Sequence, residues 1–406
     1  METSPPTHAD IVVVGAGPAG SACAHRLAAA GHDVLLVDQH RFPRDKVCGD
    51  GLIPDAHAAL RRLGVLDAVM ARAQRVRHVR CIGTRGRTID VPGTLAVLPR
   101  RELDELLFRN ACEAGARALV PARFVEPLLD GERVAGVRLR IGDATHDVSA
   151  RWVVLATGAA GGPLESSGVC DRRVPSGMAI RGYVKNDAMV GRITELEIRW
   201  HPRLKGGYGW IFPAPGGVFN IGTGITGLLR AQDGGAAGGK LLDVNLRSMF
   251  ETFLDVHPAA RELVQGGRFV GELKGAPLRC SLTGARWTRP GLLVTGEAAG
   301  STYAFTGEGI GKAMETGLAA ADVLATERDE QAVRTRYEAA LAALQPRFAL
   351  YERAQRVNAH PWLANLLIWR AQRSPRLLRR MAGVLEETSN PGHLVTMKGV
   401  MRLLTE

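Results

Sequence analysis

Hydrophobic runs that end in glycine divide the start of the chain into short elements. Residues 9–14 (ADIVVV) form an apolar run rich in β-branched residues, which is typical of a buried parallel strand. Residues 21–30 then predict a helix that ends at Gly31, and residues 33–37 predict a second strand. A strand, a turn, a helix and a strand therefore occupy the first 38 residues.

Similar patterns return further along the chain. Residues 152–156 and 291–295 are apolar runs that each enter a glycine turn, and residues 101–116 and 307–326 have helical spacing. Residues 134–139 alternate like a strand. We therefore expect the parallel sheet to be assembled from separate parts of the chain.

Between about residues 182 and 279 the pattern changes to short segments of alternating polarity. Residues 193–200 and 210–213 are examples, and they predict an antiparallel sheet. The stretch at 231–239 (AQDGGAAGG) predicts a flexible surface loop. After about residue 330 the pattern is helical and rich in arginine.

The turn after the first strand carries a G-x-G-x-x-G motif. Its glycines are Gly15, Gly17 and Gly20, with Ala19 before the last, and it opens the predicted helix. The first glycine permits the tight turn, the second lets a pyrophosphate approach the backbone, and the third lets the helix pack closely. Asp38 ends the second strand, where its carboxylate can accept hydrogen bonds from ribose hydroxyls. A glycine turn beside a surface aspartate is the alternative, and the motif alone does not distinguish FAD from NAD.

These elements predict an α/β fold, α+β overall. It combines a Rossmann-type nucleotide-binding domain, an inserted antiparallel β-sheet substrate domain and a helical C-terminus. The length of 406 residues is consistent with two or three packed units. We expect the nucleotide-binding domain over residues 1–75, 100–180 and 276–330, the substrate domain over 76–99 and 181–275, and a basic helical C-terminal segment over 331–406.

Positive charge is concentrated at the C-terminal end. Lys+Arg 52 and Asp+Glu 41 give a net charge of +11, and residues 331–406 hold 12 basic and 5 acidic residues, or +7 of that total. No element that reads nucleic acid accompanies this charge, so we expect no nucleic-acid partner. Residues 360–380, in which Trp362 and Trp369 precede a run of arginines, are typical of a peripheral membrane contact. A helix packed on its own protein is the alternative, and a lipid substrate would favour the membrane.

The six cysteines are dispersed and form no C-x-x-C pair, and residues 1–10 lack a basic segment followed by an apolar one. We therefore expect no disulfides, no export, and a cytoplasmic protein with at most a peripheral membrane contact. No apolar run reaches the roughly 18 residues that span a bilayer. HExxH and Walker A patterns are absent, so we expect no metal site and exclude metalloproteases and P-loop NTPases.

A second glycine-rich strand, turn and helix start lie at residues 291–300 (GLLVTGEAAG) and 305–310 (FTGEGI). This region resembles the second FAD signature of the flavoproteins that include aromatic hydroxylases, flavin halogenases and geranylgeranyl reductases, which implies FAD as the cofactor. In that group an acid, usually Asp, binds the ribityl chain, and the helix N-terminus faces the flavin pyrimidine. Here the acid is Glu297, and Ala304 replaces a proline of the turn. The residues that the resemblance assigns to FAD are Gly296, Glu297, Gly307, Gly309 and Ile310.

Two further positions are similar to this group. Thr157 and Gly158 follow the strand that ends near Leu155, where the group commonly has Ala-Asp-Gly, so Thr157 replaces an aspartate. Arg100, four residues before Asp104, matches an arginine that precedes a helix near the cofactor. The resemblance therefore implies that Arg100, Thr157 and Gly158 contact FAD.

Two stretches are similar to the geranylgeranyl reductase family in particular. Residues 43–52 (PRDKVCGDGL) match its P-R-x-K-x-C-G-x-G-L stretch, and residues 208–213 (YGWIFP) with 220–224 (NIGTG) match its Y-x-W-x-F-P…G-x-G strands. The resemblance implies an enzyme that reduces carbon–carbon double bonds of an isoprenoid or related apolar substrate, by hydride transfer from reduced flavin.

Cys48, Tyr208 and Trp210 are the candidate catalytic residues. Cys48 can be a proton donor, a redox partner or a small packing residue in its glycine loop. Tyr208 and Trp210 fall two apart, so on a strand they share one face, where they either line an apolar pocket over the flavin or pack as core aromatics. The proton for the reduction would come from Cys48, Tyr208 or water.

Two other functions stay open. A flavin-dependent monooxygenase, or a halogenase, would act on an aromatic or secondary-metabolite substrate, with Lys46 in the halogenase lysine's role. Hydroxylases of this group tend to carry His where this chain has Gly300, which favours the reductase. A flavoprotein that passes electrons or binds a partner through its basic tail is the third hypothesis. No second dinucleotide motif appears, so NADPH, NADH or a protein can be the reductant, and the sequence does not indicate the oligomeric state.

Overall fold

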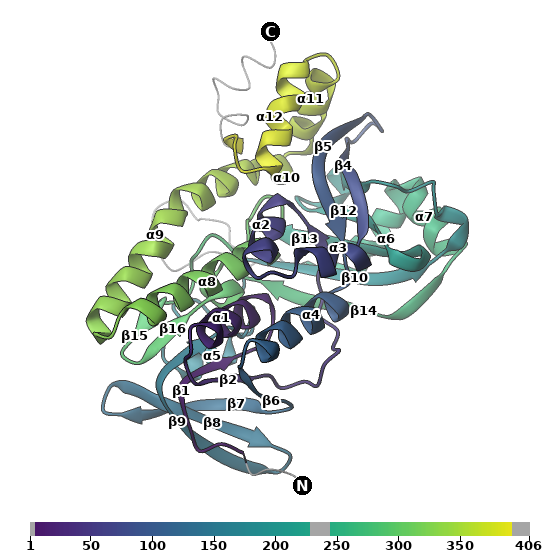
Figure 1. Cartoon of the computed structure of the whole chain (residues 1–406). Helices are drawn as coiled ribbons and strands as arrows, with labels where there is room; N and C mark the ends of the chain where they lie inside the picture. The colour runs from purple at the N-terminus through teal and green to yellow at the C-terminus, as the bar shows by residue number, and fades with distance from the viewer. Residues whose placement is uncertain (1–4, 228–243, 392–406) are drawn as a thin grey trace.

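The computed structural model describes residues 5–227 and 244–391, so the predicted loop at 231–239 lies outside the described residues. The described chain forms two eight-stranded sheets and a helical C-terminal part (Figure 1). The predicted α/β fold with a second sheet and a helical C-terminus is therefore confirmed.

The first sheet has a core of parallel strands. Its strands are β1 (His8–Val14), β2 (Val34–Val37), β6 (Arg117–Leu119), β7 (Arg123–Asp130), β8 (Arg133–Ile141), β9 (Ala144–Leu155), β15 (Thr288–Arg289) and β16 (Leu292–Val294). Neighbours are parallel along the order β16, β9, β1, β2, β6, whereas β7, β8 and β15 are added antiparallel. The apolar runs predicted as strands meet here, because a parallel strand buried on both faces needs consecutive apolar residues.

Helices cover one face of this sheet and the β7–β8 hairpin packs on the other. The helices are α1 (Pro18–Ala29), α4 (Arg100–Glu113), α8 (Ile310–Thr326) and α9 (Glu330–Ala354). α1 begins three residues before the predicted start, because Pro18 suits the first helical position. α8 begins three residues after the predicted start, because Gly307, with a φ of +72°, belongs to the preceding turn.

The second sheet is antiparallel except where β11 pairs with β4. In spatial order its strands are β14 (Arg268–Leu278), β10 (Gly177–Lys185), β13 (Val218–Thr226), β12 (Tyr208–Ala214), β11 (Leu196–Trp200), β4 (Gln74–Ile82), β5 (Thr88–Val97) and β3 (Gly51–Leu52). Helices α6 (Leu246–Val256) and α7 (Pro258–Gln265) pack on it. Residues 193–195, predicted as part of a strand, precede β11, and residues 51–52, which we assigned to the nucleotide-binding domain, pair with β5.

The C-terminal helices reach from the first sheet to the second. α9 contacts β15, and α10 (Arg356–Ala359), α11 (Pro361–Ala371) and α12 (Pro375–Leu385) follow it. α11 and α12 pack against β5 and form one end of the molecule (Figure 1). The remaining helices are α2 (Pro54–Arg62), α3 (Leu66–Arg72) and α5 (Gly162–Ser166).

The packing of α1 on α8 depends on one glycine. A β-carbon at Gly317 of α8 would lie 2.2 Å from the carbonyl oxygen of Ala19 in α1. We expect Gly317→Ala to lower the free energy of unfolding by about 1–3 kcal/mol, because the added methyl group forces the helices apart. Chemical denaturation measures the change. Gly162→Ala in α5 is the matched control, since a β-carbon there meets no atom within 4 Å; equal losses in both variants would contradict the packing argument.

Candidate functional site

A cavity of about 920 Å³ lies between the carboxyl ends of the parallel strands, the second sheet and the C-terminal helices. Such an edge is where open α/β sheets bind ligands. Most predicted site residues line this cavity. They are Gly15, Gly17, Ala19, Asp38, Cys48, Arg100, Thr157, Gly158, Tyr208, Trp210, Glu297, Gly307, Gly309 and Ile310.

Gly20, the motif glycine that we expect to let the helix pack closely, and Gly296, which the resemblance assigns to FAD, are not among the lining residues. A β-carbon at Gly20 would lie 1.8 Å from the carbonyl oxygen of Gly15, and one at Gly296 would lie 2.6 Å from the β-carbon of Ala19. Both glycines therefore permit close packing of backbone around α1. Their place in the motifs reflects this packing, which supports the cavity without contacting it.

The first two glycines of the motif form a cradle for a diphosphate. Gly15 has a φ of +101°, and a β-carbon there would lie 2.4 Å from the carbonyl oxygen of Ala156, so only glycine fits this turn. At Gly17 the nearest atoms to a β-carbon are guanidinium nitrogens of Arg44 and Arg100, at 3.7 and 3.8 Å. Two cations therefore face an open backbone position at the start of α1, where a diphosphate fits.

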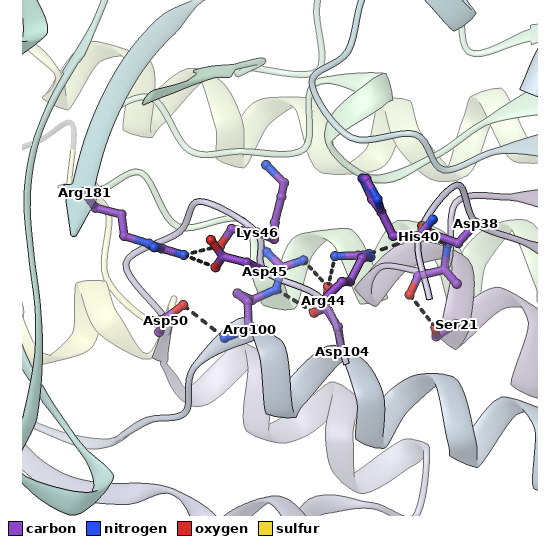
Figure 2. Close-up of polar contacts among 11 residues, drawn as sticks. Ser21, Asp38, His40, Arg44, Asp45, Lys46, Asp50, Arg100, Asp104 and Arg181 are labelled. Atoms are coloured by element: carbon purple, nitrogen blue, oxygen red, sulfur yellow. Dashed lines mark hydrogen bonds and ion pairs between the residues drawn. The ribbon is translucent and has the colours of Figure 1, made fainter. Parts of the chain in front are cut away.

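Two carboxylates hold these two arginines, and one of the carboxylates is shared by both (Figure 2). Arg100 donates to Asp104 through Nε at 2.6 Å and Nη2 at 2.9 Å, and Arg44 Nη1 lies 2.9 Å from the same carboxylate. Asp38 accepts from the backbone N–H of Ala16 at 3.0 Å and lies 3.4 Å from Arg44 Nη2. Burial lowers the pKa of Arg100, but Asp104 and Cys48 together raise it by more, so the guanidinium stays charged. Arg44 was not among the site residues that we predicted from the sequence. Its position in the PRDKVCG stretch, which is similar to the family, could have indicated it.

The acidic turn and the start of α8 supply the other half of a cofactor site. Glu297, in η4 (Gly296–Ala299), lies with Oε2 4.0 Å from a β-carbon placed on Gly158. The hydroxyl of Thr157 is buried and has no hydrogen-bond partner among the described residues. No side chain caps α8, so its first N–H groups are left for a ligand. An acceptor, an unpaired hydroxyl and a helix N-terminus on one wall fit the ribityl chain and pyrimidine of FAD.

Tyr208, Trp210 and Phe212 form a row of aromatic rings along β12. Neighbouring ring centroids are 6.2 and 6.3 Å apart, and all three side chains line the cavity. The Trp210 ring lies over Gly222 of β13, where a β-carbon would come within 2.4 Å of it. This close approach is the physical reason that the aromatic row on β12 faces a G-x-G sequence on β13.

The Tyr208 hydroxyl donates a hydrogen bond of 2.7 Å to the carbonyl oxygen of Thr306. Burial raises the pKa of Tyr208, with Glu308 as the second cause. Its proton is engaged and weakly acidic, so the geometry favours Tyr208 as part of the wall over Tyr208 as the proton source.

Asn220 joins the aromatic row to the loop that carries Cys48. This side chain is fully buried, and its Oδ1 accepts from Trp210 Nε1 at 2.9 Å. Its Nδ2 donates to the carbonyl oxygen of Cys48 and to Asp50 Oδ2, both at 2.7 Å. One amide therefore fixes the position of the Cys48 backbone relative to the Trp210 ring. We quoted Asn220 in a motif, but its partners are not visible in the sequence.

Asp50 is the second anchor of this loop. It has a φ of +65°, and its carboxylate accepts from the Tyr183 hydroxyl at 2.6 Å. The same carboxylate accepts from the backbone N–H of Arg100 at 3.2 Å (Figure 2). Burial raises the pKa of Asp50 to about 6, although Tyr183 and Asn220 favour its charged form. The Asp50 carboxylate therefore contacts residues from both parts of the site, Arg100 beside the cofactor cradle and Tyr183 and Asn220 in the second sheet.

A buried arginine anchors the same loop from the second sheet. Arg181 of β10 donates to Asp45 Oδ1 at 2.6 Å and to the carbonyl oxygen of Lys46 at 2.8 Å (Figure 2). Lys274 Nζ lies 3.2 Å from the other oxygen of Asp45. These contacts hold residues 45–46 across the gap between the two sheets.

Glu308 is a carboxyl on the cavity wall that our sequence reasoning missed. It stands between Gly307 and Gly309, and its backbone oxygen accepts from the N–H of Tyr303 at 2.8 Å. Burial raises the pKa of Glu308 to about 8, and the nearby Asp55 adds to this. A carboxyl kept neutral at neutral pH can donate a proton. The GEG sequence at residues 307–309 could have drawn attention to Glu308. The burial that raises its pKa, however, depends on the fold.

Another part of the cavity wall is apolar. It is formed by the second sheet, the turn before α8, and the inner faces of α11 and α12. Representative side chains are Val91, Ile198, Phe305, Leu367, Met381 and Leu385. A polar cradle and an apolar chamber therefore belong to one continuous cavity.

Residues 5–227 and 244–391 contain neither a cluster of metal ligands nor a membrane-spanning helix. These residues contain no group of three His, Cys, Asp or Glu side chains placed to hold a metal ion. No helix among them is long and apolar enough to cross a membrane.

Removal of the Asn220 amide should release the Cys48 loop. We expect Asn220→Ala to raise the reaction rate of the Cys48 thiol with a disulfide reagent by at least about tenfold, because Asp50 and Trp210 lose a buried partner worth about 1–3 kcal/mol. The measurement uses a background in which Cys112 and Cys170, the other partly exposed cysteines, are replaced by Ser.

Asn358→Ala is the matched control for this experiment. Asn358 is also buried, accepts from Trp200 Nε1 at 2.8 Å and donates to the Phe305 carbonyl oxygen at 2.9 Å, but it does not contact the Cys48 loop. Equal thiol exposure in both variants would mean that general loosening, not the Asn220 contact, controls the loop.

Comparisons with known proteins agree with this geometry. A family model described as an FAD binding domain matches residues 8–184. A menaquinone reductase of Mycolicibacterium smegmatis is 34% identical over 336 residues, which cover 78% of this chain and 76% of the relative. A digeranylgeranylglycerophospholipid reductase of Methanopyrus kandleri is 32% identical over 329 residues, covering 79% of this chain and 78% of the relative.

Solved structures share the fold over nearly the whole chain. A geranylgeranyl bacteriochlorophyll reductase-like protein from Thermoplasma acidophilum has a TM-score of 0.71 at 22% identity, covering 99% of this chain and 97% of that one. A flavin-dependent brominase has a TM-score of 0.73 at 18% identity and covers 98% of each chain. With the motifs, the cavity and these relatives together, the chain belongs to the geranylgeranyl reductase family of FAD-dependent oxidoreductases.

Proposed function

We propose that this protein reduces carbon–carbon double bonds of an isoprenoid or a related apolar lipid. The observation that carries the proposal is the single cavity in which a cradle suited to FAD continues into an apolar chamber. Relatives named menaquinone reductase and digeranylgeranylglycerophospholipid reductase support an apolar, isoprenoid-bearing substrate.

The residues at the junction have distinct tasks in this reaction. Reduced FAD, when bound, would supply a hydride to one carbon of the double bond, and a proton must reach the other. Trp210 and Phe212 hold the double bond against the cofactor side of the cavity and exclude water from it. The Cys48 thiol and the neutral Glu308 carboxyl line the same cavity and are the two candidate proton donors.

The geometry at Gly300 favours reduction over hydroxylation. This residue has a φ of +87°, and a β-carbon there would lie 2.8 Å from the backbone nitrogen of Thr283. The histidine that hydroxylases of the group tend to carry at this place therefore has no room here. A monooxygenase or halogenase is the alternative function, and its product differs in mass.

Product mass decides between these functions. The FAD-loaded protein is reduced anaerobically with dithionite and mixed with a detergent-dispersed polyprenyl substrate. The mass of the product is then measured by mass spectrometry. A gain of two hydrogens supports the proposal. No product without air, but a gain of one oxygen atom or a halogen when air and halide are admitted, would overturn it. NADPH and NADH, tried separately in place of dithionite, identify the reductant.

Replacement of the Cys48 thiol tests its part in the reaction. We expect Cys48→Ala to keep FAD bound and to slow product formation by at least about tenfold, a barrier change of about 1.4 kcal/mol. Cys112→Ala is the matched control, because that thiol is also partly exposed but does not line the cavity. Unchanged turnover in Cys48→Ala would remove the thiol from the mechanism.

The raised pKa of Glu308 predicts a pH-dependent stability. Because the folded chain holds this proton up to about pH 8 and the unfolded chain releases it near its ordinary pKa of 4.5, stability falls as pH rises between these values. Glu308→Gln removes this dependence, so the difference in Tm between variant and wild type should shift in favour of the variant from about pH 5.5 to about pH 8.5. The exposed Glu272→Gln is the control, and the same shift there would exclude Glu308 as its source.

A further inference from the structure

The α11–α12 hairpin has two chemically different faces. Its inner face contributes Leu367, Ile368, Met381 and Leu385 to the apolar chamber of the cavity. The helices therefore form a roof over the place that we propose for the substrate. This roof comes from the part of the chain in which positive charge is concentrated.

The outer face of the hairpin is cationic. From residue 353 to residue 385 the sequence has seven arginines and no Asp or Glu. Arg373, Arg376, Arg379 and Arg380 are exposed, and Arg373 lies over the Trp369 ring at 4.9 Å. Trp362, at the start of α11, is 57% exposed.

These arginines lack the carboxylate partners that arginines elsewhere on the surface have. Arg138, for example, pairs with both Asp147 and Glu126, and Arg192 pairs with Glu262. Among the described residues, no ion pair includes any of the seven arginines between residues 353 and 385. The charge of this face is therefore not balanced within the described chain.

The hairpin is fixed to the body of the protein. Asn365 Oδ1 accepts from the backbone N–H of Thr84 at 2.7 Å, and Gln372 Nε2 donates to the carbonyl oxygen of Thr88 at 2.9 Å. After α12, Glu387 accepts from the Tyr303 hydroxyl at 2.7 Å and from Lys312 at 2.8 Å. The cationic face therefore keeps a set orientation relative to the cavity beneath it.

We propose that the outer face of α11–α12 docks on the surface of a bilayer that contains anionic lipids. Guanidinium groups bind lipid phosphates, and an exposed tryptophan beside them suits the interface between headgroups and acyl chains. Docking would place the roof of the apolar chamber against the membrane, where an isoprenoid lipid resides. This choice of partner rests on the proposed function, whereas the unpaired cationic face does not.

The test measures sedimentation of the full FAD-loaded chain with vesicles. We expect binding to phosphatidylcholine vesicles with phosphatidylglycerol at about 2:1 to be at least about tenfold tighter than to phosphatidylcholine alone, and to weaken as salt is raised. R376Q/R379Q/R380Q should lose most of this binding, and Trp362→Ala should weaken it. The control R61Q/R72Q/R268Q removes the same charge from exposed arginines on α2, α3 and β14 and should bind as the wild type does.

Turnover on two forms of the same substrate separates this inference from the proposed function. The R376Q/R379Q/R380Q variant should reduce a detergent-dispersed polyprenyl substrate normally and a vesicle-embedded one at least about tenfold more slowly, because only docking is impaired. Normal turnover on both forms, or equal loss of vesicle binding in the charge-matched control, would overturn the docking surface. Tighter binding of duplex DNA than of anionic vesicles would also overturn it. Vesicle binding without turnover on either form would overturn the proposed function alone.

Discussion

A single buried amide, that of Asn220, holds together three parts of the site that come from distant positions in the chain. It accepts from the Trp210 indole and donates to the Cys48 backbone and to Asp50. A buried amide that loses a partner is destabilising, so all three hydrogen bonds must be satisfied together. The Cys48 loop and the aromatic row therefore cannot shift independently, and the distance between the thiol and the substrate wall is set by this contact.

Charge fixes the same loop relative to the cofactor cradle. Arg44 and Arg100 share the carboxylate of Asp104 on the side of the first sheet, and Arg181 pairs with Asp45 on the side of the second. Buried ion pairs add specificity when their geometry is satisfied and are costly when one partner is lost. The loop thus aligns the two sheets, which have separate cores, and this alignment makes a polar cradle and an apolar chamber one cavity.

The cradle could be predicted from the sequence because its chemistry is local. A strand, Gly15, Gly17 and a helix N-terminus are neighbours in the chain, and a parallel strand buried on both faces leaves an apolar run that is easy to recognise. Asn220 and Glu308 belong to motifs that the sequence shows, but their roles could not be predicted from it. The hydrogen bond of Asn220 spans 172 residues, and the burial of the Glu308 carboxyl depends on the tertiary structure. The packing role of Gly20 was predictable for the same local reason, because the third glycine of the motif lets the helix pack closely on the strand, and a β-carbon there would lie 1.8 Å from the carbonyl oxygen of Gly15.

The α11–α12 hairpin shows why the sequence of the C-terminal segment permits two interpretations, a helix packed on its own protein and a helix that contacts a membrane. A helix that packs on its own protein and a helix that meets a membrane share an apolar stripe and a basic face. In the structure the apolar stripe of α11 and α12 packs against β4 and β5, so this stripe is not evidence for membrane contact. The exposed arginines remain, because they repel one another and no carboxylate among the described residues pairs with them. An anionic membrane surface offsets this repulsion. Because the cationic face lies above the apolar chamber, docking there brings the chamber next to the lipid.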